Sequence, residues 1–295
     1  MSDAPARATS LEELGTKIEL MFVKEEIVEG LKLKLRPTDV VITPFAKCGT
    51  TWTQQIVHTL RTRGDTDFDD ISRVVPWIET ATSLGLDLDA EQKANPRAFK
   101  SHLGWDKVPR GGKYIVSVRD PKDALWSFYK FTEGWFVEPG SISLDDYARA
   151  IFIETRNYWK HLASWWPRRN DGDMLMMTFE HMKTDLTGTI RKIAAFIDVE
   201  LDAELLETTE EHASLTFMQK HKDKFDDLLM RQRSEAIAGI PPGSDSAKVR
   251  SGQVGEHKQH LSADVAAELD AIWSEEITAT FGFETYADLA ATLNE

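Results

Sequence analysis

A chain of 295 residues is long enough for one large α/β domain or two small ones, and its 41% hydrophobic content suffices for a core. Its formal net charge of −14 argues against duplex nucleic acid or an anionic membrane surface as the main partner. The single cysteine excludes an internal disulfide, and no run reaches the ~18 apolar residues that a membrane span needs. Because the first residues also lack an apolar signal core, we expect a cytoplasmic protein.

The first half of the chain is predicted to alternate helices with short strands. Residues 1–9 are expected to form a flexible tail before a single domain over residues 10–295. Ser10-Leu11-Glu12-Glu13 has the form of a capping box and predicts a helix that runs to about Glu29. The elements expected next are a strand at 39–43, a helix at 50–63, an irregular region with a short helix from residue 74, an extended piece at 99–102, a strand at 114–118 and a helix at 121–131.

The second half is predicted to be mainly helical. After a loop at 134–140 we expect the longest helix at 143–166, a buried apolar strand at 174–178, helices at 180–197 and 203–212, a long functional loop at 219–256 and a closing helix at 262–281. Strands that alternate with helices predict an α/β fold, a single domain with a central parallel sheet flanked by helices. In such sheets ligands bind beyond the carboxyl ends of the strands.

The first strand ends in a loop that suits an anion. Lys47 supplies a full positive charge, Gly49 allows close backbone approach, and Thr50 and Thr51 open the next helix, whose free N–H groups attract negative charge. Trp52, one turn into that helix, offers a flat apolar face for a ring. The spacing differs from the Walker A loop, in which the lysine follows the second glycine.

A second anion site is predicted where the strand at 114–118 ends. Arg119 stands at the carboxyl end of that strand, and Ser127 lies eight residues further on in the next helix. A guanidinium and a hydroxyl on one face there suit a phosphate group.

These two segments resemble motifs of the cytosolic sulfotransferases. Residues 47–52, Lys-Cys-Gly-Thr-Thr-Trp, are similar to the family's Lys-Ser-Gly-Thr-Thr-Trp loop, and residues 119–127 match Arg-Asn-Pro-Lys-Asp-x-x-x-Ser at all but one defined position. The chain is therefore identified as a bacterial member of the family that uses 3′-phosphoadenosine 5′-phosphosulfate, with a P-loop-like sulfotransferase fold. The resemblance implies that the first loop grips the 5′-phosphosulfate and that Arg119 and Ser127 hold the 3′-phosphate. Cys48 takes the place of the family serine, most simply as a small residue tolerated in the loop.

Later segments complete the cofactor site that the resemblance implies, with replacements. Residues 248–258 resemble Arg-Lys-Gly-x-x-Gly-x-Trp-Lys, so Arg250, Ser251 and Gly252 are expected at the 3′-phosphate, although Ser251 replaces a lysine and His257 replaces the tryptophan. The adenine pocket is expected to include two further positions. Phe179 stands where the family has a tyrosine, and Ser214 precedes Leu215, which replaces a stacking phenylalanine.

The catalytic base is expected at His102. Phe99-Lys100-Ser101-His102-Leu103 resembles Lys-Thr-His-Leu-Pro, whose histidine is the family's base. Imidazole titrates near neutrality and suits removal of a proton from an alcohol or phenol. Lys100, two residues before, is expected on the same face, where it holds the sulfonate oxygens while Lys47 stabilises the departing phosphate. Adenosine 3′,5′-bisphosphate would be the product, and no metal is implied.

The acceptor is not identified by the sequence. Phe45, Trp77, Phe131 and Trp135 are candidates for its pocket, with ordinary core packing as the alternative. The family's dimer motif would fall at residues 258–267, where three defining residues are replaced, so the oligomeric state stays open. Two alternative functions also stay open: a P-loop kinase of a small molecule, and a sulfotransferase-like protein that binds the nucleotide without activity.

Overall fold

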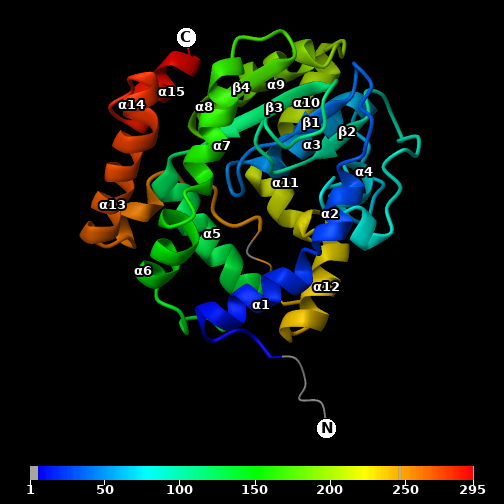
Figure 1. Cartoon of the computed structure of the whole chain (residues 1–295). Coiled ribbons are helices and arrows are strands. Elements are labelled where there is room, and N and C mark those ends of the chain that lie inside the picture. The colour runs from blue at the N-terminus through cyan, green and yellow to red at the C-terminus, as the bar shows by residue number, and fades with distance from the viewer. Residues whose placement is uncertain (1–5, 245, 247, 295) are drawn as a thin grey trace.

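The computed structural model describes residues 6–244, 246 and 248–294 and centres on a four-stranded sheet (Figure 1). The strands are β1 (Val40–Ile42), β2 (Ala98–Lys100), β3 (Lys113–Val118) and β4 (Met174–Thr178), in the order β2-β1-β3-β4. All neighbouring strands pair in parallel, so their carboxyl ends meet at one edge of the sheet. The predicted α/β fold with a parallel sheet is confirmed, and the extended piece expected at 99–102 is the edge strand β2.

The sheet is buried on both faces because its side chains alternate between two hydrophobic clusters. Val41 and Tyr114 belong to one cluster, whereas Ile42 and Ile115 belong to the other. Adjacent strands at the same register therefore send equivalent side chains to the same face. This double burial explains why the strands read as continuous apolar runs rather than as an alternation of polar and apolar residues.

Helices cover both faces of the sheet (Figure 1). The helices are α1 (Leu11–Met21), α2 (Lys24–Gly30), α3 (Thr50–Thr62), α4 (Ile71–Val74), α5 (Pro121–Trp135), α6 (Leu144–Tyr147), α7 (Asn157–Trp165), α8 (Phe179–Thr184), α9 (Leu186–Phe196), α10 (Ala203–His212), α11 (Leu215–Lys220), α12 (Leu228–Ala238), α13 (Ala263–Trp273), α14 (Ala279–Phe281) and α15 (Tyr286–Asn294). Helices α3, α9 and α10 contribute to one hydrophobic cluster, and α1, α5, α7, α12, α13 and α15 contribute to the other.

Three predicted helices are interrupted, and the one expected at 180–197 is divided at Asp185 into α8 and α9. The helix expected from Ser10 to Glu29 is α1 and α2, which are separated at Phe22, whose ring meets the Trp77 ring edge-on at 5.7 Å. The helix expected at 143–166 is α6, a π-helical segment and α7. It breaks at Arg156, whose backbone is left-handed (φ 53°) and whose guanidinium pairs with Glu275 and Glu276. These contacts join residues far apart in the chain and stabilise the interruptions at Phe22 and Arg156. No local sequence pattern indicates them.

The ends of the chain and the predicted long loop contain more structure than expected. Ala8 is buried and exchanges backbone hydrogen bonds with Phe136 and Glu138, so residue 8 of the predicted tail is anchored; residues 1–5 lie outside the described residues. The region 219–256 contains helix α12, and a further helix, α15, follows the helix predicted to close the fold. Helix α12 was missed because its weakly amphipathic sequence is held by contacts to other elements, including a hydrogen bond from the Ser234 hydroxyl to the carbonyl of Trp135.

Candidate active site

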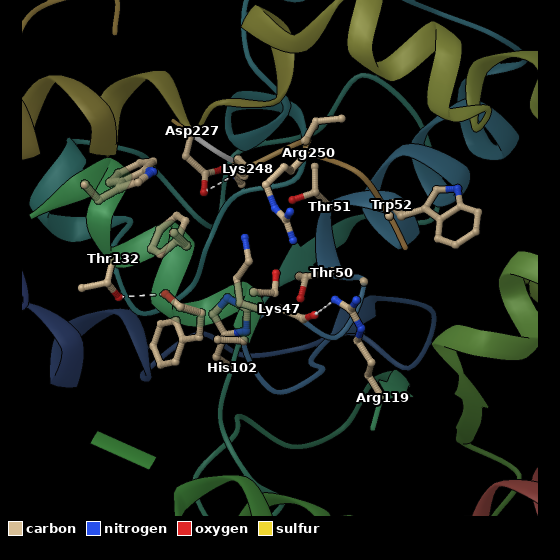
Figure 2. A pocket seen from close by; sticks show the side chains of 18 of the residues that line it. Lys47, Thr50, Thr51, Trp52, His102, Arg119, Thr132, Asp227, Lys248 and Arg250 are labelled. Atoms are coloured by element: carbon tan, nitrogen blue, oxygen red, sulfur yellow. Dashed lines mark hydrogen bonds and ion pairs between the residues drawn. The ribbon is translucent and has the colours of Figure 1, made fainter. Parts of the chain in front are cut away.

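One cavity of about 570 Å³ lies where the strands end and extends between the helices (Figure 2). In Figure 2, Trp52 and Arg119 lie on one side and Thr132 lies on the other, with Lys47 and His102 between them. We call the side with Trp52 and Arg119 the basic side; it is lined by Lys47, Gly49, Thr50, Thr51, Trp52, Arg119, Ser127, Phe179, Lys183, Leu186, Ala213, Ser214, Leu215, Arg250, Ser251 and Gly252. We call the side with Thr132 the apolar side; it is lined by Leu14, Ile18, Met21, Phe22, Phe128, Phe131, Thr132, Trp135, Phe136, Tyr147, Ile151 and Met230.

The loop between β1 and α3 forms the floor of the basic side. Lys47 adopts a left-handed backbone (φ 68°), which is uncommon for a residue with a side chain, and the Arg119 guanidinium donates a hydrogen bond to its carbonyl at 3.2 Å. The Lys47 Nζ lies 4.6 Å from the centre of the Phe131 ring. Burial, together with the nearby charges of Lys248 and Arg119, lowers the pKa of Lys47 to about 7. This amine would therefore gain charge most readily when an anion enters the cavity.

Gly49 allows the loop to pass close to its neighbours. Its backbone is left-handed (φ 98°), and a Cβ at this position would lie 3.1 Å from the Phe179 ring. The next residue, Thr50, starts α3, and its Oγ1 is buried without a hydrogen-bond partner among the described residues. The first N–H groups of a helix likewise have no acceptor within the helix. The loop thus presents unsatisfied donors to the cavity.

Cys48 is buried beneath the loop and does not line the cavity. The Ser117 hydroxyl donates a hydrogen bond to its carbonyl at 2.5 Å, which ties the loop to β3. Burial raises the pKa of the Cys48 thiol to about 12. A reactive thiolate is therefore absent, in keeping with a small residue tolerated in the loop, and direct contact between this side chain and a ligand is not supported.

Arg119 joins the end of β3 to two other segments. Besides the Lys47 carbonyl, it donates a hydrogen bond to the carbonyl of Gln253 at 2.8 Å, and its guanidinium lies 4.4 Å from the centre of the Phe179 ring. Trp52 meets the same ring edge-on at 5.6 Å and is fixed by a hydrogen bond from its Nε1 to the carbonyl of Ala213 at 2.8 Å. Charged and aromatic groups thus lie side by side at the end of β3.

The predicted adenine residues also lie on this side. Phe179 is 7% exposed, and Ser214 begins α11, where its hydroxyl accepts a hydrogen bond from the backbone of Phe217 at 3.1 Å. Leu215 is 42% exposed although it lines the cavity, so this wall is aliphatic and accessible.

The loop after α12 closes the basic side. Arg250 forms a two-pronged ion pair with Glu256, with both distances 2.6 Å, and the Ser251 hydroxyl donates to the same carboxylate at 3.1 Å. These bonds, led by Arg250, lower the pKa of Glu256 to about 2. His257, at the position of the family tryptophan, places its Nδ1 2.7 Å from an oxygen of Asp123. It therefore anchors the loop to α5.

His102 lies at the centre of the cavity in the state that a base requires. Its Nδ1 is 2.9 Å from the carbonyl of Pro44, which can only accept, so Nδ1 carries the proton and Nε2 keeps its lone pair. Its backbone N–H donates to Glu79 at 2.8 Å, and its ring meets Trp77 edge-on at 5.1 Å. Burial, reinforced by Lys100, lowers the pKa of His102 to about 3, which keeps the ring neutral at neutral pH.

Lys100 also lines the cavity, as the alternation of side chains along the strand predicts. It is 3% exposed, and its Nζ lies 2.9 Å from a carboxylate oxygen of Asp227 and 4.0 Å from the centre of the Trp77 ring. Lys248 pairs with the same oxygen of Asp227. Burial lowers the pKa of Lys100, and the Asp227 carboxylate opposes that shift.

Three of the four aromatic residues proposed for an acceptor line the cavity, namely Trp77, Phe131 and Trp135. Phe45 does not. Its ring packs in the hydrophobic core, 5.5 Å from Tyr158 and 5.8 Å from Phe152, because the loop turns before Lys47 and directs the side chain behind the cavity.

Several residues of the apolar side were not found from the sequence. Leu14, Ile18 and Met21 come from α1, and Met230 comes from α12. The spacing of four and three residues within α1 is typical of one face of a helix, but it does not reveal what that face contacts. Asp227 belongs to no recognisable motif, and Lys248 opens the segment at 248–258 but matches none of its defined positions.

Among the residues that the structure describes, no group of three or more His, Cys, Asp or Glu side chains is arranged to hold a metal ion. Nor does any described helix have the length and apolar character of a membrane span.

Comparison with known proteins identifies the family of this chain. The amine sulfotransferase of Oryctolagus cuniculus is 27% identical over 277 residues, which cover 89% of each chain, and the luciferin sulfotransferase of Photinus pyralis is 26% identical over 313 residues, covering 94% of this chain and 81% of that protein. The fold matches that of retinol dehydratase, solved with androsterone and the inactive cofactor PAP, with a TM-score of 0.71 at 18% identity, covering 92% of this chain and 96% of that one. The model of the sulfotransferase domain family matches residues 37–281, so this chain belongs to that family and is a sulfotransferase.

Proposed function

We propose that this sulfotransferase takes the sulfuryl group of 3′-phosphoadenosine 5′-phosphosulfate and transfers it to a hydroxyl group of a small, largely apolar acceptor. The observation that carries the proposal is the position of His102. Its unprotonated Nε2 belongs to a cavity that is basic on one side and apolar on the other. A proton acceptor at such a junction suits a reaction between an anionic donor and an apolar alcohol or phenol.

The residues of the basic side fit the proposed donor. The buried Thr50 hydroxyl and the first N–H groups of α3 need acceptors, which phosphate oxygens provide. Arg119 and Arg250 suit a second phosphate, and the rings of Trp52 and Phe179 suit a base. Two solved relatives of the same fold, retinol dehydratase and a mouse sulfotransferase, contain PAP, the desulfated nucleotide.

The proposed reaction is a direct displacement at sulfur. The acceptor oxygen forms a bond to sulfur while the bond between sulfur and the bridging phosphate oxygen breaks. The acceptor proton passes to Nε2 of His102, and the electron pair of the broken bond stays on the 5′-phosphate. Lys47 and the loop N–H groups stabilise that charge, and Lys100 neutralises the sulfuryl oxygens. The products are a sulfate ester and adenosine 3′,5′-bisphosphate.

The apolar side favours acceptors with a hydrophobic body. Ile18, Phe131, Trp135 and Met230 line it, and the hydroxyls of Thr132 and Tyr147, 2.8 Å apart, are occupied with each other. Relatives of the same fold were solved with retinol or androsterone, two apolar alcohols. An amine acceptor is less suited here because Lys47, Lys100 and Lys248 repel a cation.

A direct assay tests the proposal. We expect the purified chain to transfer label from radiolabelled donor to members of a panel of alcohols and phenols, and to transfer less to aliphatic amines. We also expect adenosine 3′,5′-bisphosphate alone to raise the melting temperature. Stabilisation by ATP with magnesium but not by the bisphosphate would instead support a kinase. Stabilisation by the bisphosphate without transfer to any acceptor would support an inactive nucleotide-binding protein.

A further inference from the structure

One buried carboxylate joins two lysines in the wall of the cavity. Asp227 is 4% exposed, and one of its oxygens pairs with Lys248 Nζ (Figure 2). The same oxygen lies 2.9 Å from Lys100 Nζ. All three residues line the cavity. They come from β2, from the residue before α12 and from the loop after α12, so the fold brings them together over more than a hundred residues of chain.

This arrangement restricts the direction of the Lys100 amine. A lysine ammonium has three N–H donors. One is directed to the Asp227 carboxylate, and the face of the Trp77 ring, 4.0 Å from Nζ, attracts the positive charge from another side. The ammonium therefore has a fixed position and retains donor capacity for a ligand in the cavity.

The backbone around Asp227 leaves its carboxylate available to bind Lys100 and Lys248. Asp227 has a left-handed backbone (φ 49°) and directly precedes α12, where an aspartate usually caps the helix. Here Asp70, from the start of α4, accepts the hydrogen bond from the backbone of Leu228 at 2.7 Å instead. A second carboxylate thus stabilises the helix terminus, and Asp227 binds the two lysines.

We propose that Asp227 is a positioning residue for sulfuryl transfer. Its carboxylate holds the Lys100 amine in place and keeps that amine charged. Lys248 binds the same carboxylate, and its positive charge disfavours the charge on Lys100. The proposal rests on the proposed function, because Lys100 acts there on the sulfuryl oxygens. Asp227 itself contacts neither donor nor acceptor in this role.

The charges that face Lys100 predict opposite effects of the two neighbours. Asp227 and Glu79 raise the pKa of Lys100, whereas burial and Lys248 lower it. Lys47 and His102 share the cavity, and Asp70 lies close enough to interact with Asp227. Loss of Asp227 should therefore release the Lys100 proton at lower pH, and loss of Lys248 should retain it to higher pH.

The experiment compares kcat against pH for the full-length wild-type protein, Asp227→Asn and Lys248→Met at saturating donor. We expect Asp227→Asn to lower kcat at neutral pH by about 10- to 100-fold with little change in the KM for the donor, and to move the alkaline limb to lower pH by roughly one unit. Lys248→Met should move that limb to higher pH. A role only in stability would not move the limbs in opposite directions.

Asp198→Asn is the matched control. Asp198 has the same left-handed backbone (φ 57°) and pairs with Lys113 at 2.5 Å, but it does not line the cavity. We expect it to keep the wild-type profile. If Asp227→Asn does not fold, Asp227→Asn with Lys248→Met removes one charge of each sign, and kcat should still fall because Lys100 loses its partner.

The proposal about Asp227 would be overturned if the alkaline limbs of Asp227→Asn and Lys248→Met stayed in place or moved in the same direction, even where the wild-type protein transfers sulfate. Failure of the wild-type protein to transfer sulfate to any acceptor would instead reject the proposed function itself.

Discussion

The basic and apolar sides of the cavity are built in different ways. The basic side is made mostly of residues in loops after strands or at the start of helices, such as Arg119 and Thr50, and the loop before α3 presents backbone N–H groups to it. The apolar side is made of side chains from helices far apart in the sequence, such as Ile18 of α1 and Met230 of α12. A site fixed by backbone geometry requires particular residues at particular spacings. A site made by packed side chains requires only apolar volume, and it can vary without changing the fold.

Replacement of His102, which lies between the two sides, should have the largest effect. We expect His102→Ala to reduce kcat by about 10²- to 10⁴-fold while the affinity for adenosine 3′,5′-bisphosphate stays near that of the wild type, because in the proposed mechanism the base contacts the acceptor proton and not the nucleotide. Steady-state kinetics and calorimetric titration of the bisphosphate measure the two effects.

His161→Gln is the control for that variant. His161 is also buried, and its Nε2 lies 3.0 Å from the carbonyl of Thr43, but it does not line the cavity. The kcat of the His161→Gln variant should remain within a few-fold of the wild-type value. Equal loss of turnover and nucleotide binding in His102→Ala would contradict the separation of roles.

A smaller effect should appear in the pH dependence of the basic side. The pKa of Lys47 is lowered to about 7 in the protein without ligand, and an anion beside it would raise that value. Below the lowered pKa the lysine is already charged; above it, binding must be accompanied by proton uptake. The dissociation constant of the bisphosphate should therefore rise as pH increases above about 7, by up to about tenfold per pH unit.

Calorimetric titration from pH 7 upward measures this dependence, and Lys47→Met should flatten it. Lys183→Met is the matched control, because Lys183 also lies on the basic side but hydrogen-bonds the carbonyl of Gly252. This variant should keep the slope. An unchanged slope in Lys47→Met would assign the titration to another group.

The smallest effect should come from the apolar side. We expect Ile18→Ala to raise the KM for an apolar acceptor by about 3- to 10-fold, since a few methyl and methylene contacts are lost, and to leave the KM for the donor unchanged. Leu20→Ala, on the same helix but 56% exposed and outside the cavity, should change neither. A parallel rise in the donor KM would show that the two sides are not independent.

The same contrast explains what the sequence revealed. The parallel sheet was predictable because three of its strands, at 40–42, 113–118 and 174–178, are mostly apolar and alternate with helical segments. Lys47, Arg119 and His102 were found because each lies in a motif next to a strand. Asp227 and Lys248 were missed because their pairing depends on how α12 docks, and Phe45 was misplaced because the turn before Lys47 decides which way its side chain points.

Helix α1 contacts α12 through hydrogen bonds from Lys17 to the carbonyl of Ile237, at 3.3 Å, and from Arg233 to the carbonyl of Leu20, at 3.0 Å. One wall of the apolar side therefore unites the beginning of the chain with a segment made late in translation. While the ribosome is still producing residues 228–238, the nascent polypeptide already contains the Lys47 loop, Lys100 and His102, yet it has no finished chamber for an acceptor. The apolar side is thus completed only when α12 has been made, and the basic side only when residues 250–252 have followed it.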